Sequence, residues 1–351
     1  MPKAITADNI ADLVSTTLDH LGPPRFYQVA QELPRYVFVD DMLKSKVQFD
    51  TGKGIERDAM FTHEERAHHT SMFATNNVAI PDVMSKIRIP WKHTTTNYAF
   101  EAREFSMNTG AARLADLVKT RRVDALLGFV SLMERTAWNS NATSDDQNTA
   151  PYGVNTYVVR GTTEGFTGAN PTGFTSGVGG VNSTNVANWR NYYAEYGSVS
   201  KDDLLAKMRR CMRNIDFRAP MNGQTEDQTH GNSNKMYTNE TVINALELLA
   251  EAQNDNLGMD LAPYTDRAMI NRVPIRWVPY LDDVADNPIY LLNTGYFFPV
   301  VLSGWYLREK VIKDNPMQHN SVAVHIDLTW NMMCVDRRRQ AVLVQEDASP
   351  A

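Results

Sequence analysis

The sequence has few of the features that mark enzymes, secreted proteins and membrane proteins. Cys211 and Cys334 are the only cysteines, which excludes a disulfide framework and favours a reducing compartment. No apolar run approaches the ~20 residues that span a bilayer, and no signal peptide is predicted in residues 1–25. The 35 basic residues are outnumbered by 41 acidic ones, and the net charge of −6 argues against a primarily nucleic-acid-binding protein.

Signatures of catalysis and of cofactor binding are also missing. There is no G-x-S-x-G elbow, and the glycine-rich run at 161–180 has neither G-x-G-x-x-G after a strand nor the lysine of a phosphate loop. The best metal candidate is the segment HEERAHH, which contains His63, His68 and His69. Its spacing is not H-E-x-x-H, so we interpret it as a solvated or interface surface. We therefore predict no catalytic residue, no metal and no cofactor.

What is present suits a sizeable α+β fold. Of 351 residues, 42% are hydrophobic and 22% charged, so a large core is available. Spacings of three and four predict one long helix over 111–138, about 42 Å in length. Arg121 and Arg122 interrupt its apolar stripe. Shorter helices are predicted over 5–21, 200–217 and 240–253. Ser200 and Asp203 fit a capping box, and Thr238 or Asn239 can cap the last helix.

Strand patterns flank these helices. Residues 36–39 are predicted as a strand, and 50–85 as a loop with little regular structure. Ile87, Ile89 and Trp91 alternate with polar residues, as do Tyr98 and Phe100, which predicts two half-buried strands joined by a turn at 93–96. Residues 139–199 are expected to be the loosest part, although their aromatic cluster should dock onto something. Further strands are predicted at 273–277, 289–292, 297–302, 322–328 with a continuation at 332–335, and 341–344.

The basic triplet Arg337–Arg339 precedes the last predicted strand, and three interpretations remain open. It can form a solvated edge, pair with a neighbouring subunit, or contact packaged phosphates. The two cysteines are interpreted as small buried hydrophobic residues.

The polar passage from about 36 to 105 has too few apolar residues to form a core of its own. It must lie on another surface, and a second copy of the chain is the simplest one. This points to an assembly subunit rather than a catalyst.

The order of these elements, together with phrases such as IPWKHTTTNYAFEAREFSMN, IYLLNT and CVDRRRQAVL, resembles the major capsid protein of tailed bacteriophages. The resemblance covers essentially the whole chain and implies the Hong Kong 97 phage-type fold. It implies an N-arm at 1–35 and an extended loop (E-loop) at 36–107. A peripheral domain at 108–235 would carry the spine helix 111–138, with return strands at 318–351, and an axial domain would occupy 236–317.

The resemblance further implies self-assembly through pentamers and hexamers into an icosahedral head that encloses double-stranded DNA. Partners would be the chain itself, a portal, any scaffold or decoration proteins, and packaged DNA without sequence specificity, but no membrane. The protein would reside in the virion shell after assembly in the host cytoplasm. An encapsulin-like nanocompartment shell is the alternative, and a metal-dependent hydrolase is a third.

Within that resemblance, the E-loop is expected to lie on the spine helix of a neighbour. We expect no N-terminal cleavage, and no crosslink through Lys44, Lys46, Lys53 or Lys86. The candidate inter-subunit contacts are Ile87, Ile89, Trp91, Tyr98, Phe100, Arg103, Glu104, Arg121 and Arg122.

Overall fold

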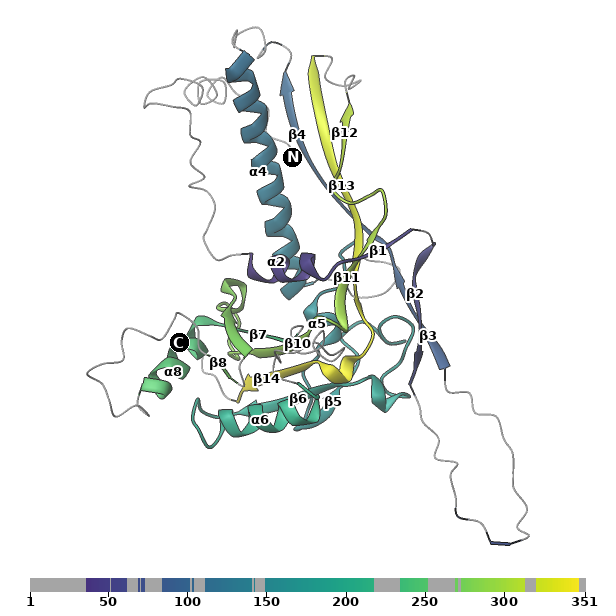
Figure 1. Cartoon of the computed structure of the whole chain (residues 1–351), viewed down its shortest axis with the longest axis vertical. Coiled ribbons are helices and arrows are strands. Elements are labelled where there is room, and N and C mark those ends of the chain that lie inside the picture. The colour runs from purple at the N-terminus through teal and green to yellow at the C-terminus, as the bar shows by residue number, and fades with distance from the viewer. Residues whose placement is uncertain are drawn as a thin grey trace. The chain divides into compact units, whose positions relative to one another are not determined.

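The computed structural model describes residues 36–50, 52–61, 69, 71–72, 84–101, 103, 111–140, 142, 149–217, 234–251, 269–270, 273–312 and 320–346 (Figure 1). They form two compact units. The first contains the described residues within 93–133 and 304–329, and the second those within 34–92, 134–303 and 330–351. Helices and strands combine in an α+β fold, which confirms the predicted class.

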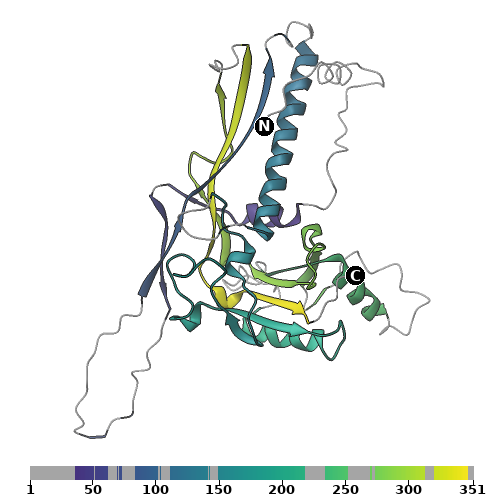
Figure 2. The ribbon, with the colours of Figure 1, turned by 180° about the vertical axis from the view of Figure 1, so that it is seen from behind.

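The first unit combines one helix with three strands. Figures 1 and 2 show α4 (Ala111–Trp138) alongside β4 (Lys92–Glu101), β12 (Arg308–Ile312) and β13 (Ser321–Cys334). β13 pairs with both β4 and β12. Tyr98, Ala125, Val324 and Ile326 form the buried cluster between helix and strands. Alternate side chains of β4 and β13 therefore pack on one face of α4, as expected of half-buried strands.

The second unit is built on a seven-stranded sheet in the order β5-β6-β14-β10-β7-β9-β8. These strands are β5 (Gly165–Gly168), β6 (Asn191–Tyr196), β7 (Asn234–Thr238), β8 (Met269–Ile270), β9 (Val273–Trp277), β10 (Ile289–Asn293) and β14 (Ala341–Gln345). Helices α6 (Leu204–Asn214) and α8 (Glu240–Glu251) bury Met208 and Leu246 in one core with the sheet. Burial of these apolar side chains is the main force that holds the unit together.

Smaller elements complete the second unit. β1 (Val47–Phe49) pairs in parallel with β11 (Phe297–Leu302), which pairs with the end of β13. β2 (Gly54–Met60) and β3 (Met84–Pro90) form a separate antiparallel pair. The short helices are α2 (Val37–Lys44), α5 (Val154–Tyr157) and the single turns η1 (Ala187–Trp189), η2 (Pro279–Leu281) and η3 (Arg337–Arg339).

Several predicted elements are confirmed. The long helix occurs at 111–138, as predicted. The helix predicted over 240–253 ends at Glu251, and its cap is Asn239, whose Oδ1 accepts the backbone N–H of Val242. The strands predicted after residue 270 all form. The helix predicted over 5–21 lies outside the described residues.

Three predictions for the polar arm are wrong. Residues 36–39 are not a strand, because Val37–Lys44 forms helix α2, with Phe38 and Met42 buried on one side. Residues 50–85 are predicted as a loop with little regular structure, but strand β2 occupies Gly54–Met60 and β3 begins at Met84. No turn occurs at 93–96, because β4 runs through it. The predicted strand pair instead separates: β3 pairs with β2, and β4 pairs with β13.

The predicted loose region and the predicted domain boundary also need correction. Residues 139–199 contain β5 and the buried strand β6, which pairs in parallel with β14. The expectation that its aromatic residues dock is confirmed, since Trp189 and Tyr196 are buried. A boundary at 235 divides the seven-stranded sheet, because β5 and β6 precede it and β7 to β10 follow it. The E-loop range 36–107 likewise contains β3 and β4, which belong to different units.

Candidate subunit-contact surfaces

The β2–β3 pair is the candidate E-loop element, and its inner face is already covered by its own chain. Seven residue pairs run from Gly54–Pro90 to Met60–Met84. Ile55, Ile87 and Ile89 are 0–1% exposed. Both isoleucines therefore pack within their own chain, and their contact with a neighbour stays a prediction.

A glycine fixes the position of β3. The N–H of Arg88 donates to the carbonyl of Gly179 at 2.9 Å. Gly179 has φ +67°, and a Cβ built there would lie 2.8 Å from Cγ2 of Ile87. Only glycine allows this left-handed conformation and this close approach together. The glycine-rich run therefore has a structural role, because Gly179 holds β3 in position.

The described side chains on the outer face of the strand pair are mostly polar. Arg88 and Glu56 form an ion pair at 2.9 Å, and Met60 is 64% exposed. Half-buried Trp91 follows β3 and donates its indole N–H to the carbonyl of Gly52 at 3.0 Å. An exposed ion pair contributes little to folding stability. These groups therefore remain available for contact with another molecule.

The remaining candidate residues belong to the first unit, where several serve that unit itself. Tyr98 is buried, and burial raises the pKa of its hydroxyl. Its contact with a neighbour stays a prediction. Phe100 is half-buried against the same cluster. Arg121 donates to the carbonyl of Ala99 at 2.8 Å.

Arg122, next along α4, is bound to Glu309 on β12. The guanidinium approaches the carboxylate at 2.6 Å, and this hydrogen bond raises the pKa of Arg122. Arg103 is exposed and lies 3.5 Å from Glu101. Glu104 lies outside the described residues. Arg121 and Arg122 interrupt the apolar stripe of α4. Their hydrogen bonds and ion pair instead connect α4 to β4 and β12.

A buried glutamate holds helix α2 in the second unit. The carboxylate of Glu134, which is 0% exposed, accepts the N–H groups of Val39 at 2.8 Å and Phe38 at 3.3 Å, and the indole N–H of Trp138 at 3.0 Å. A carboxylate at a helix N-terminus satisfies backbone donors that have no partner within the helix. Burial nevertheless raises the pKa of Glu134 to about 7, despite these three hydrogen bonds.

The basic triplet is not a solvated edge. Arg337 is fully buried and donates to the carbonyls of Tyr157 and Ala169 at 2.7 and 2.8 Å. Burial lowers its pKa to about 10. Arg338 bonds Asn188, and Arg339 pairs with Asp216. Sequence reasoning missed the role of Arg337 because its acceptors come from segments about 170–180 residues away.

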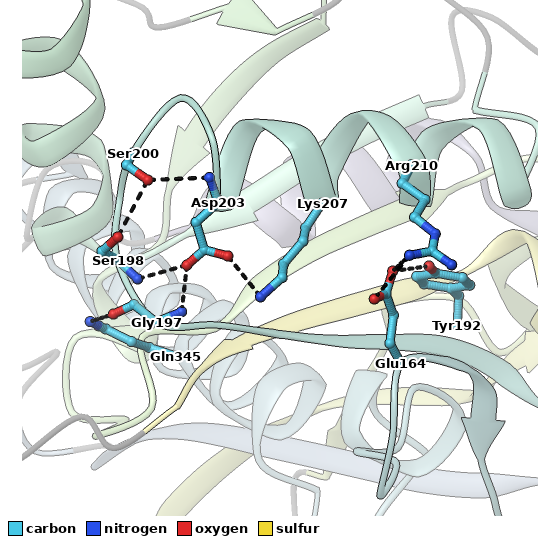
Figure 3. A network of polar contacts seen from close by, with 9 residues as sticks. All are labelled: Glu164, Tyr192, Gly197, Ser198, Ser200, Asp203, Lys207, Arg210 and Gln345. Carbon is cyan, nitrogen blue, oxygen red and sulfur yellow. Dashed lines mark hydrogen bonds and ion pairs between the residues drawn. The ribbon is translucent and has the colours of Figure 1, made fainter.

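The start of α6 carries a polar network (Figure 3). The predicted capping box is half confirmed, since Ser200 Oγ accepts the N–H of Asp203 at 3.2 Å. The carboxylate of Asp203 instead reaches back to the N–H groups of Gly197 and Ser198, at 2.7 and 2.9 Å, and pairs with Lys207. Partial burial acts to raise the pKa of Asp203, but these bonds outweigh it and lower the pKa.

Farther along α6, the network continues through Glu164, as Figure 3 shows. This carboxylate accepts the hydroxyl of Tyr192 at 3.0 Å and pairs with Arg210 at 3.2 Å. Burial raises the pKa of Tyr192 to about 12. These contacts fasten α6 to β6, and they leave Arg209 and Arg213 on another side of the helix.

An open groove of about 780 Å³ lies beside α6. Its lining residues are Leu205, Arg209, Met212, Arg213, Asp216, Phe217, Met269 and Ile270. Sequence reasoning did not identify this groove, because α6 and β8 are separated by more than 50 residues.

The cysteines are buried, as predicted, and burial raises the pKa of both thiols. Within the described residues, no group of three His, Cys, Asp or Glu side chains could hold a metal ion. Of the proposed histidines, only His69 is described, and it is exposed. In the same part of the chain, no helix is long and apolar enough to cross a membrane.

Comparisons with known proteins give a consistent result at the level of structure. No family model matches the sequence, and no curated protein matches it either. The capsid asymmetric unit of cyanophage A-1(L) superposes with a TM-score of 0.66 at 13% identity, over 92% of this chain and 96% of that one.

Two further capsids show the same likeness. The capsid of a native GTA particle, computed with C5 symmetry, gives a TM-score of 0.57 at 13% identity over 98% and 99% of the two chains. The capsid of Myoviridae phage XM1 gives 0.52 at 11% identity over 99% and 100%. The described elements and these whole-chain superpositions together establish that this chain has the major-capsid-protein fold of tailed phages.

Proposed function

We propose that this chain is the major capsid protein of a tailed phage and has a structural, non-enzymatic role. It assembles through pentamers and hexamers into an icosahedral head around double-stranded DNA. The observation that carries the proposal is the extent of the structural likeness. It covers 92–99% of this chain and 96–100% of three solved capsid chains, so the likeness is to the complete shell subunit rather than to a shared domain.

Exposed apolar side chains support contacts between copies. Met60 on β2 and Leu132 on α4 are 64% and 36% exposed. Trp91, Phe100 and Arg103 also retain exposed surface, so we keep them as contact residues. Arg121 and Arg122 can add to such a contact while they remain bound to β4 and β12. An interface needs apolar anchors with a polar rim, and these residues supply both.

The arrangement of the sheets supports the following assignment of domain roles. We assign the N-arm to 1–35 and the E-loop to the β2–β3 region. The spine helix is α4, in the peripheral domain with β4, β12 and β13. The seven-stranded sheet with α6 and α8 is assigned to the axial domain, because it is one core that a boundary at 235 would divide.

Other partners follow from this role. A portal, together with any scaffold or decoration proteins, would contact the shell, which forms in the host cytoplasm and becomes part of the virion. Packaged DNA would be enclosed without sequence-specific binding. Neither the nanocompartment shell nor the hydrolase is favoured by the solved structures described above, which are capsids.

Electron microscopy of the purified full-length chain, alone and with the neighbouring gene products of its genome, tests the proposal. Regular shells are expected. Failure of the concentrated wild-type chain to form particles, even with these products present, would contradict it.

A variant sharpens the test of the E-loop. Residues 62–83 are replaced by a short Asn-Gly turn, which suits an antiparallel pair ending at Met60 and Met84. Phe61 is retained because its ring packs on Trp189 and its carbonyl accepts from Asn188. We expect a folded protein that forms no regular shell. Normal shells from this variant would show that the replaced segment does not hold neighbours together.

A further inference from the structure

The groove beside α6 combines an apolar floor with two arginines. Met212 and Phe217 are 4–5% exposed, and Leu205 and Ile270 pack against the core behind them. Met269, on the rim, is 61% exposed. The groove therefore offers apolar surface that the described part of the chain leaves uncovered.

The two arginines have no acidic partner among the described residues. Arg209 and Arg213 are exposed and lie one helical turn apart, so their like charges face the same opening. The cations beside them are already paired: Arg210 with Glu164, and Arg339 with Asp216. The groove thus has a local positive excess on a chain whose net charge is −6.

The exposed face of α8 has the complementary character. Glu240, Asn244, Glu247 and Leu248 are exposed and follow the spacing of one helical stripe. Val242 and Leu246 point the opposite way into the core. Leu248 is 66% exposed, and Glu247 stands next to it. An apolar side chain beside a carboxylate matches an apolar floor beside two guanidinium groups.

Among the residues that the structure describes, this complementarity is not used within one chain. Helices α6 and α8 bury side chains in the same core of the second unit, so their exposed faces point away from it. A contact between the α6 groove of one copy and the α8 face of another joins two different patches. Such heterologous contacts repeat around an axis and close into rings.

We propose that the α6 groove receives the exposed face of α8 from a second copy of this chain, with Leu248 on the apolar floor and Glu247 beside Arg209 or Arg213. This inference rests on the proposed shell function and names a contact within its rings. Complementary charge would set the direction of the ring, because two grooves or two α8 faces would repel each other.

Charge exchange in the full-length chain tests the contact. Arg209→Glu with Arg213→Glu, or Glu240→Arg with Glu247→Arg, should each reduce the particle yield by roughly tenfold or more, because attraction becomes repulsion at every contact. The chain that carries all four changes should regain particles. Lys201→Glu and Asp202→Arg, exposed and just ahead of α6, are matched controls that should assemble normally. Unchanged melting temperatures would show that each variant folds.

A second measurement detects the contact itself. A chain with Arg213→Cys is mixed with one carrying Leu248→Cys, and mild oxidation should give a cross-linked dimer across the two chains. Lys201→Cys mixed with Leu248→Cys should give none. A dimer formed without any shells would support this contact and contradict the shell function. Wild-type shells without a cross-link, with the charge variants assembling normally, would overturn the contact and leave the function intact. Charge variants that assemble normally but enclose less DNA would also overturn it, because the groove would then contact nucleic acid.

Discussion

Ionisation of Glu134 should make the free energy of unfolding of this chain depend on pH. The carboxylate is fully buried and holds the first turn of α2 through Phe38 and Val39. Burial raises its pKa from 4.5 to about 7. Asp41 raises this pKa slightly further, and Asp41 itself is bound to Tyr237 and Arg276.

The sign of the effect follows from which state holds the proton. Between pH 4.5 and 7 the folded chain keeps the Glu134 proton while the unfolded chain has lost it. The stability from this group is therefore fully present below pH 4.5 and is lost as the pH rises through 7. A shift from 4.5 to about 7, at 1.36 kcal/mol per pKa unit, amounts to about 3 kcal/mol.

Urea unfolding of the unassembled chain between pH 5 and 8, followed by tryptophan fluorescence, measures this dependence. Trp138 is a suitable reporter because its indole N–H donates to Glu134. The variant Glu134→Gln cannot ionise, so its curve should lack the slope, although its amide group faces donors and lowers stability at every pH. The gap between the two curves should change by about 2–3 kcal/mol over this range.

Glu247→Gln, on the exposed face of α8, is the matched control and should keep the wild-type slope. Parallel curves for wild type and Glu134→Gln from pH 5 to 8 would refute the reasoning. They would mean that the three hydrogen bonds offset the burial of the carboxylate completely.

Two further predictions concern the second unit. Arg337→Met should lower the free energy of unfolding by about 3–5 kcal/mol, measured by urea titration, because it leaves buried carbonyls unpaired. Arg338→Met, at an exposed site, should cost less than about 1 kcal/mol, and equal losses would contradict the buried role of Arg337. Gly179→Ala should destabilise by about 2–3 kcal/mol, from positive φ and the contact with Ile87. Gly180→Ala, with similar φ but nothing within 4 Å, should cost only about 1 kcal/mol, and indistinguishable melting curves for the two would show that β3 does not need the close approach.

Long local patterns were predictable, and short ones were not. Helix α4 could be bounded from its sequence because its 28 residues repeat one apolar spacing over many turns. Helix α2 was mistaken for a strand because its first residues, Val37–Val39, are β-branched or aromatic. Its helical form depends on Glu134, about 95 residues away, whose carboxylate caps it. Strand β6 was missed for the same reason, since its partner β14 lies about 150 residues farther along the chain.

The candidate contact surface shows the same division. The alternation around Ile87 and Ile89 correctly indicated a half-buried strand, but the sequence could not tell whether the cover came from the same chain or from a neighbour. The hydrogen bond between Arg88 and Gly179 shows that the segment packed against β3 belongs to the same chain. The groove beside α6 could not be predicted, because α6 and β8 meet only after the sheet has assembled.

The sequence by itself determined the α+β class, the long helix, the closing strands and the absence of catalytic motifs, because these depend on composition and on local periodicity. Only the tertiary structure decided which polar residues are internal. Arg337 and Glu134 look like surface residues in the sequence, yet both are buried where backbone carbonyls or N–H groups from distant segments meet their charge. The physical reason is that a charged side chain can be buried only where its partners converge, and that convergence is a property of the folded chain.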